Sequence, residues 1–177
     1  MDPLFVSALA VAAAEIGDKT QLLTLLLTLR YRRPWLISIG ILLATLANHA
    51  GAALAGEGIS RVFGADLLRY LLAASFVLMG LWLLRPDRID AEEEQRSYGG
   101  VLASTCVLFF LAEMGDKTQI ATVALGAQYN ALIPVVAGTT LGMLIANVPV
   151  AFGGQAIVKR LPVQWIQRGA AALFIFL

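Results

Sequence analysis

A seven-residue sequence rich in polar side chains occurs twice in this chain of 177 residues. The copies are Glu15–Gln21 and Glu113–Gln119, which lie 98 positions apart and differ only at their second residue. Each copy carries two carboxylates, a lysine, a threonine and a glutamine. Carboxylate, hydroxyl and amide oxygens are ligands that suit Ca²⁺, Mn²⁺ and Mg²⁺. The pair of motifs therefore predicts a site for a divalent cation.

The side chains of both motifs define one candidate site. Its predicted cation ligands are the oxygen-bearing residues Glu15, Asp18, Thr20, Gln21, Glu113, Asp116, Thr118 and Gln119. We interpret Lys19 and Lys117 as counter-ions that pair with the carboxylates when the cation leaves. The six charges sum to −2, which matches a divalent cation. Because clustered carboxylates repel one another in apolar surroundings, at least one should take up a proton when the site is empty.

Both motifs lie in a strongly apolar chain. Hydrophobic residues make up 59% of the sequence, charged residues make up 14%, and the mean hydropathy is +0.78, which predicts an integral membrane protein in contact with a lipid bilayer. One charged residue at the centre of a membrane helix costs about 2.5–3.5 kcal/mol, so charges in such a chain indicate a function. A net charge of +1 without a basic face excludes a nucleic-acid partner.

Other interpretations use the same residues. The glutamates and lysines could form i,i+4 ion pairs that only hold helices together, but such pairs need no second carboxylate. Asp18 and Asp116 could form the dyad of an intramembrane aspartyl protease, but the neighbouring glutamates and lysines would disturb a shared proton. The carboxylates could also line a passive cation channel, which only a measurement of proton coupling would distinguish from a transporter. We predict neither an enzyme nor a bound cofactor, and we expect the metal to be the transported substrate.

Six apolar runs are candidates for membrane-spanning helices. They cover residues 4–29, 35–56, 66–84, 99–126, 131–154 and 161–177. The predicted fold is therefore an all-α membrane protein with six transmembrane helices. The last run is short and the sequence stops within it, so we expect a native end beyond Leu177. Small residues in the spans would allow association into a homo-oligomer.

The two motifs are separated by three spans, so the helices that carry them should cross the membrane in opposite directions. We predict two inverted three-helix repeats, residues 1–85 and 99–177, joined by a polar cytoplasmic loop at residues 86–98. Inverted repeats that meet at the bilayer midplane are typical of transporters that work by alternating access. The substrate site is therefore expected between the two motifs.

The local geometry of each motif is open at this point. On a regular helix Glu15 and Asp18 share one polar arc, whereas Thr20 falls outside it. Gly17 and Gly115 could serve close helix packing or could open the backbone toward the site.

Three residues of the other spans bear on the site. Asn48 and Asn147 occupy matching places and could support the site as ligands or as hydrogen-bond partners. His49 has Val148 as its counterpart; it could be a ligand, but we expect instead a neutral histidine that is hydrogen-bonded inside the bundle.

Basic residues near the ends of the spans indicate the orientation. The first, third and fifth loops hold nine of them, against two in the other loops: Arg30, Arg32, Arg33, Arg85, Arg88, Arg96, Lys159, Arg160 and Arg168, against Arg61 and Arg69. By the positive-inside rule the odd loops are cytoplasmic and both termini lie outside. An acidic run, Glu92–Glu94, is expected to be solvated loop.

Two copies of Glu-x-Gly-Asp-Lys/Arg-Thr/Ser in a chain with six spans resemble the signature of the Ca²⁺/Mn²⁺:H⁺ exchanger family. This family includes Golgi members in eukaryotes and manganese exporters in bacteria, and belongs to the cation/Ca²⁺ exchanger superfamily. The resemblance covers essentially the whole chain, and it implies secondary active exchange of metal for protons. It further implies that the cation is bound by Glu15, Asp18, Glu113 and Asp116, with Thr20 and Thr118 in support. The chain is compact, so we expect a bacterial-type plasma-membrane exporter of Mn²⁺.

Overall fold

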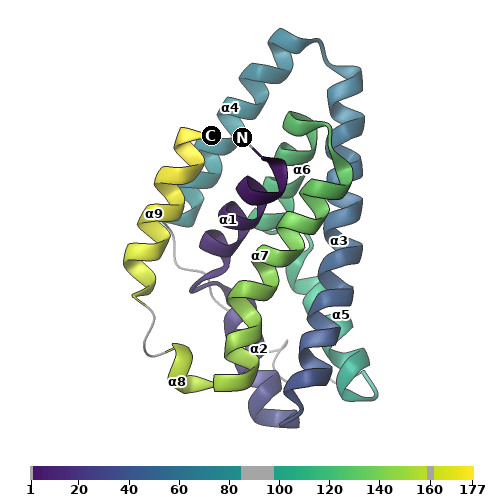
Figure 1. Cartoon of the computed structure of the whole chain (residues 1–177), viewed down its shortest axis with the longest axis vertical. Helices are drawn as coiled ribbons and strands as arrows, with labels where there is room; N and C mark the ends of the chain where they lie inside the picture. Colours follow the sequence, from purple (N-terminus) through teal and green to yellow (C-terminus); the bar gives the residue numbers. More distant parts are fainter. Residues whose placement is uncertain (1, 85–97, 159–161) are drawn as a thin grey trace.

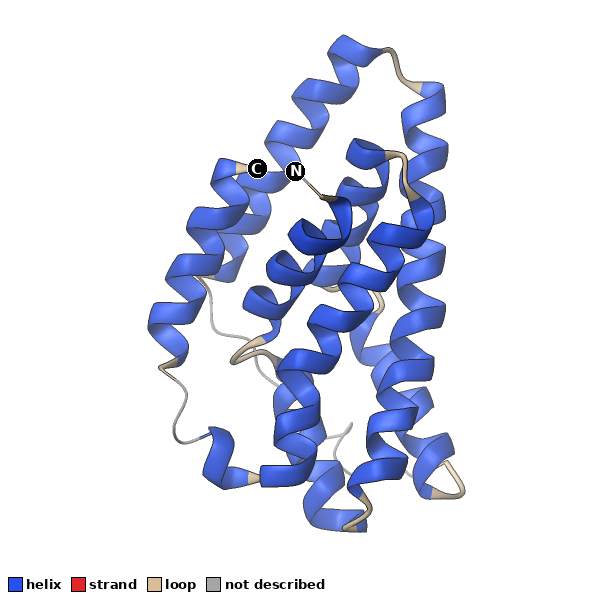
Figure 2. Cartoon of the chain, in the orientation of Figure 1, coloured by secondary structure: helices blue, strands red, loops and turns tan. Residues whose placement is uncertain are grey.

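A computed structural model describes residues 2–84, 98–158 and 162–177, and every regular element within them is a helix (Figure 1, Figure 2). The helices are α1 Pro3–Glu15, α2 Lys19–Tyr31, α3 Pro34–Val62, α4 Ala65–Leu83, α5 Val101–Glu113, α6 Lys117–Tyr129, α7 Leu132–Gly153, α8 Gln155–Val158 and α9 Val163–Phe176. The predicted polar loop at 86–98, with its acidic run, lies outside the described residues except for Tyr98.

Among the described helices, α3, α4 and α7 are long and apolar enough to cross a membrane, as judged by length and composition. They correspond to three of the predicted spans, and many large apolar side chains on them face outward, for example Ile133 and Leu78. Outward apolar surface of this extent suits contact with lipid. The described part of the chain is therefore an all-helical bundle with the character of a membrane protein.

The predicted runs 4–29 and 99–126 do not form continuous helices. Each is divided within its motif into two helices of 13 residues, α1 and α2 in one case and α5 and α6 in the other. Of the two roles considered for the motif glycines, the structure thus shows the opened backbone.

The break between α1 and α2 is a tight turn. Ile16 has φ −68° and ψ 116°, and Gly17 has φ +84°. The N–H of Asp18 donates to the carbonyl oxygen of Glu15 at 3.0 Å, which closes a type II turn. This turn requires a positive φ at its third residue, a conformation that glycine adopts without steric cost.

The break between α5 and α6 repeats this geometry. Met114 has φ −62° and ψ 118°, Gly115 has φ +74°, and the N–H of Asp116 donates to the carbonyl oxygen of Glu113 at 3.1 Å. In both turns the glutamate is the last residue of one helix and the aspartate precedes the next helix. The two carboxylates of a motif are therefore held at a helix end and a helix start.

Helices of the two halves of the chain pack against each other. In Figure 1 α1 lies along α7, and α5 lies beside α3. A Cβ at Gly40 would lie 2.6 Å from the Cβ of Thr105, and a Cβ at Gly138 would lie 2.9 Å from the Cβ of Ser7. Gly40 and Gly138 are 98 positions apart, as are Ser7 and Thr105. The two contacts are therefore equivalent: in one the glycine comes from the first half of the chain, and in the other it comes from the second half.

The remaining long helices cover the bundle unequally. α4 packs against α9 and α6, whereas α9 packs against α4 and α1. Phe76 of α4 contacts Phe174 of α9, with ring centroids 6.2 Å apart, and these residues too are 98 positions apart. The first motif turn has α9 beside it, with Val163 against Gly17, whereas Met114 and Gly115 of the second turn are exposed.

Candidate metal centre

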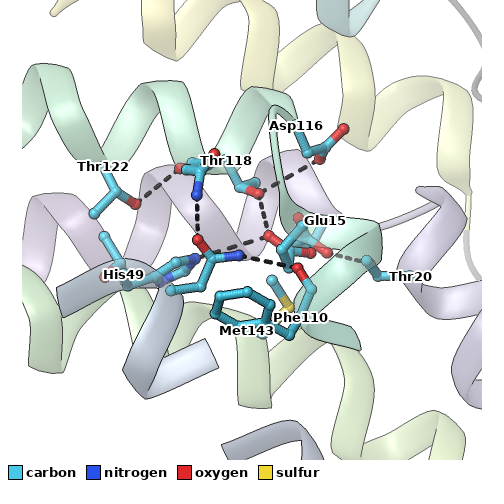
Figure 3. A network of polar contacts seen from close by, with 12 residues as sticks. Glu15, Thr20, His49, Phe110, Asp116, Thr118, Thr122 and Met143 are labelled. Carbon is cyan, nitrogen blue, oxygen red and sulfur yellow. Dashed lines mark hydrogen bonds and ion pairs between the residues drawn. The ribbon is translucent and has the colours of Figure 1, made fainter. Parts of the chain in front are cut away.

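Three carboxylates meet where the broken helices approach one another (Figure 3). Glu15 ends α1, Glu113 ends α5, and Asp116 directly precedes α6. One oxygen from each lies within 4.8 Å of those of the other two, and all three residues are buried. Three carboxylates at this spacing can coordinate one divalent cation, since oxygen ligands bind such ions at about 2.0–2.6 Å.

Within the described residues, each buried glutamate has one oxygen that accepts a hydrogen bond and one that has no hydrogen-bond partner. The hydroxyl of Thr20 donates to Oε2 of Glu15, and that of Thr118 donates to Oε2 of Glu113 at 2.8 Å. Oε1 of both glutamates has no hydrogen-bond partner among the described residues. A buried polar atom without a partner costs about 1–3 kcal/mol, and more when it is charged. These oxygens are therefore suited to accept a cation or a proton.

The lysines pair with aspartates of the opposite motif. Nζ of Lys19 lies 3.2 Å from Oδ1 of Asp116, and Nζ of Lys117 donates to Oδ1 of Asp18. Asp18 and Asp116 are equivalent positions in the two motifs, as are Lys19 and Lys117. The two ion pairs are therefore reciprocal, and Asp18 lies outside the cluster of three carboxylates.

The motif glutamines brace the turns. The side-chain oxygen of Gln21 accepts a hydrogen bond from the N–H of Gly17 at 2.9 Å, and that of Gln119 accepts one from the N–H of Gly115 at 2.7 Å. The amide nitrogen of Gln21 donates to the carbonyl oxygen of Ala146 at 2.9 Å. These side-chain oxygens were predicted as cation ligands, but in this structure they accept hydrogen bonds from the backbone of the turns.

The two asparagines are hydrogen-bonded to the helices that follow the turns. Oδ1 of Asn48 accepts from the amide of Gln119, and Oδ1 of Asn147 accepts from the hydroxyl of Thr24 at 2.8 Å. Asn147 also donates to the carbonyl oxygen of Met143 at 3.2 Å. Each asparagine therefore fixes a motif helix to a neighbouring helix from the other half of the chain.

His49 lies closer to the carboxylates than the sequence indicated. It is fully buried, and Nε2 lies 3.8 Å from Oε2 of Glu113. Neither ring nitrogen has a hydrogen-bond partner among the described residues, so the predicted hydrogen bond to the bundle is absent there. The signal available in the sequence was its departure from the repeat, because the equivalent position is Val148.

A buried acidic cluster between broken helices of a membrane bundle is the kind of site that secondary cation transporters use. The sequence matches the family model of the divalent cation/proton antiporter GDT1 over residues 3–91 and 101–177. The chain therefore belongs to this antiporter family. It is a transporter rather than an enzyme, and the metal is its substrate rather than a cofactor.

Individual relatives agree with this assignment. The chain is 50% identical over 178 residues to a protein of Vibrio cholerae serotype O1 described as "Putative manganese exporter", with 100% of this chain and 88% of the relative covered. It is 30% identical over 174 residues to a GDT1-like protein of Synechocystis, with 86% and 83% covered. GDT1-like protein 3 of Arabidopsis thaliana is 24% identical over 201 residues, with 98% and 68% covered. No solved structure matches the chain.

Proposed function

We propose that this antiporter exports Mn²⁺ in exchange for protons, and that the cation binds between Glu15, Glu113 and Asp116. The observation that carries the proposal is the meeting of these three buried carboxylates, with one oxygen on each glutamate that has no hydrogen-bond partner in the described part of the chain. The site draws on both motifs, which accounts for the presence of two copies. Asp18 is assigned to a second role, as the partner of Lys117 in this conformation.

The choice of Mn²⁺ rests on chemistry and on one relative. Carboxylate oxygens suit Mn²⁺, Ca²⁺ and Mg²⁺ alike, so the cluster alone does not rank them. The Vibrio cholerae relative is described as a manganese exporter, and half of its aligned residues are identical to those of this chain. This similarity supports Mn²⁺ as the substrate and a bacterial-type plasma membrane as the location.

Alternating access would follow from the two halves, residues 1–85 and 99–177, acting as inverted repeats with six spans in total. In this proposal the broken pairs α1–α2 and α5–α6 each count as one span. The exchanged contact pairs support it, namely Gly40 with Thr105 against Gly138 with Ser7, and the two lysine–aspartate pairs. Figure 1 draws both termini toward the same end of the molecule, as an even number of spans requires. The orientation with odd loops in the cytoplasm rests on the distribution of basic residues.

Coupling to protons follows from the charge of the site. Three carboxylates that lie within 4.8 Å of one another repel strongly when no cation is present. Lys19 pairs with Asp116, and one oxygen of each glutamate accepts a hydrogen bond from an uncharged threonine hydroxyl. Protons on the glutamates would neutralise the remaining charge, so release of the metal and uptake of protons compete for the same oxygens.

The experiment is a flux assay in proteoliposomes that contain the purified protein. A pH gradient is imposed, and Mn²⁺ entry, Ca²⁺ entry and lumenal pH are followed together. We expect Mn²⁺ flux with opposite proton movement, and loss of both in Glu113→Gln. Rapid Mn²⁺ flux without proton movement would identify a passive channel, and absence of flux under every gradient would contradict the proposed transport.

A further inference from the structure

The single histidine of this chain lies beside Glu113, one of the three clustered carboxylates, although it is not itself in the group whose ligand atoms all lie within 4.8 Å of one another. His49 lies within α3, has no exposed surface, and has two ring nitrogens without a hydrogen-bond partner among the described residues. Buried polar groups are normally paired, because each unpaired group costs about 1–3 kcal/mol. An imidazole that only filled space in the bundle would more favourably be an apolar residue. The ring is therefore expected to have a partner in the working protein.

The position of the ring indicates which partner this is. Nε2 lies 3.8 Å from Oε2 of Glu113, which is too long for a hydrogen bond. Two atoms that each lie about 2.1–2.4 Å from one cation are roughly 3–4 Å apart when they are adjacent ligands. Figure 3 shows the His49 ring beside the carboxylate cluster, on the side of α3 that faces it. The separation is thus suited to two ligands of the same ion.

We infer that His49 is a nitrogen ligand of the transported cation and that it selects Mn²⁺ against Ca²⁺ and Mg²⁺. The inference rests on the proposed site at Glu15, Glu113 and Asp116. Ca²⁺ and Mg²⁺ take oxygen ligands, whereas an imidazole nitrogen binds divalent metals of the transition series. The carboxylates supply charge for any divalent cation, and the histidine supplies the discrimination that they lack.

The repeat gives the site one such nitrogen only. The position equivalent to His49 is Val148, whose side chain cannot coordinate a metal. His49 is thus a polar residue near the site that the second half of the chain does not repeat. If one cation is bound by one imidazole, no second histidine is needed, which accounts for this departure from the repeat.

Pulsed electron paramagnetic resonance of bound Mn²⁺ tests the inference directly. The probe is Mn²⁺ added to purified protein whose affinity tag has been removed, in a buffer without nitrogen ligands. The chain has one histidine, so nuclear modulation from a coordinated imidazole nitrogen can come only from His49. We expect this modulation in the wild type and its loss in His49→Gln.

Two further measurements separate a ligand from a structural histidine. In His49→Leu, Mn²⁺ affinity should fall about tenfold or more, whereas Ca²⁺ affinity should change little. The thermal unfolding temperature without metal should stay the same or rise, because the substitution removes a buried polar group that has no hydrogen-bond partner among the residues that the structure describes. A clear loss of metal-free stability with unchanged Mn²⁺ affinity would overturn the inference.

The outcomes distinguish this inference from the proposed function. Bound Mn²⁺ that shows no nitrogen modulation in the wild type would overturn the role of His49 and would leave the carboxylate site standing. Failure of the wild type to bind Mn²⁺ at all would overturn both.

Discussion

The turn between α1 and α2 and the turn between α5 and α6 have nearly the same sequence and the same backbone, yet their surroundings differ. A Cβ at Gly17 would collide with Val163 of α9, whereas no atom of the described residues lies within 4 Å of a Cβ at Gly115. Met114, beside the second glycine, is 58% exposed. One turn is thus covered and the other is open.

The lysines differ in the opposite sense, because the buried lysine belongs to the turn with the open glycine. Lys117 has 3% of its side chain exposed and Lys19 has 25%, although each pairs with the aspartate of the opposite motif. The comparison shows that the motif determines the turn, while the helices packed around each turn determine which of its residues are exposed. In an alternating-access cycle the surroundings of the two motif turns would exchange, and the structure shows one of the two conformations.

The largest expected difference concerns the lysines. Lys117→Met removes one partner of a buried ion pair, which should cost about 3–5 kcal/mol. Lys19→Met should cost about 1–2 kcal/mol, because the Lys19 side chain is partly exposed and its charge is screened. Denaturant unfolding in detergent without metal measures both. Equal losses would mean that the two pairs share one environment.

A smaller difference is expected for the glycines. Gly115→Ala should cost about 1–2 kcal/mol, because its positive φ is strained for alanine. Gly17→Ala should cost about 2–4 kcal/mol, because Val163 must also move. Gly51→Ala is the matched control: this glycine lies within α3 with nothing within 4 Å of a Cβ, so alanine should be neutral or stabilising.

A second substitution sharpens the test of the glycines. Val163→Ala should recover part of the stability lost in Gly17→Ala and should recover none in Gly115→Ala. Recovery in both backgrounds, or in neither, would show that α9 does not cover the first turn as described.

Much of the bundle could be predicted from the sequence, because long apolar runs bounded by polar residues determine helices such as α3 and α7. Hydropathy could not predict the break at Gly17, because the apolar residues on both sides of the motif are compatible with one continuous helix or with two shorter ones. The reciprocal pairing of Lys19 with Asp116 depends on how the halves meet, and no local pattern contains that information. The site carboxylates could be predicted from their residue type and from their place in the duplicated seven-residue motif.

The assignment of individual roles needed three-dimensional contacts. Gln21 looked like a ligand because it bears an oxygen, but its hydrogen bond to Gly17 depends on the turn geometry. From the sequence His49 was expected to be a core residue. Its proximity to Glu113 arises from packing between α3 and α5, which no local sequence pattern shows. In both cases the residue type allowed several roles and the fold narrowed them.

The central claim is that one cation site is built jointly by the two motifs. Equilibrium dialysis of Mn²⁺ against the wild type, Glu15→Gln and Glu113→Gln tests this claim most directly, with metal bound per chain as the readout. The account predicts about one Mn²⁺ per wild-type chain and loss of binding in each variant, because every ligand set of this kind needs both glutamates. Two Mn²⁺ per chain, with one retained in each variant, would show that each motif binds its own ion and would contradict the account.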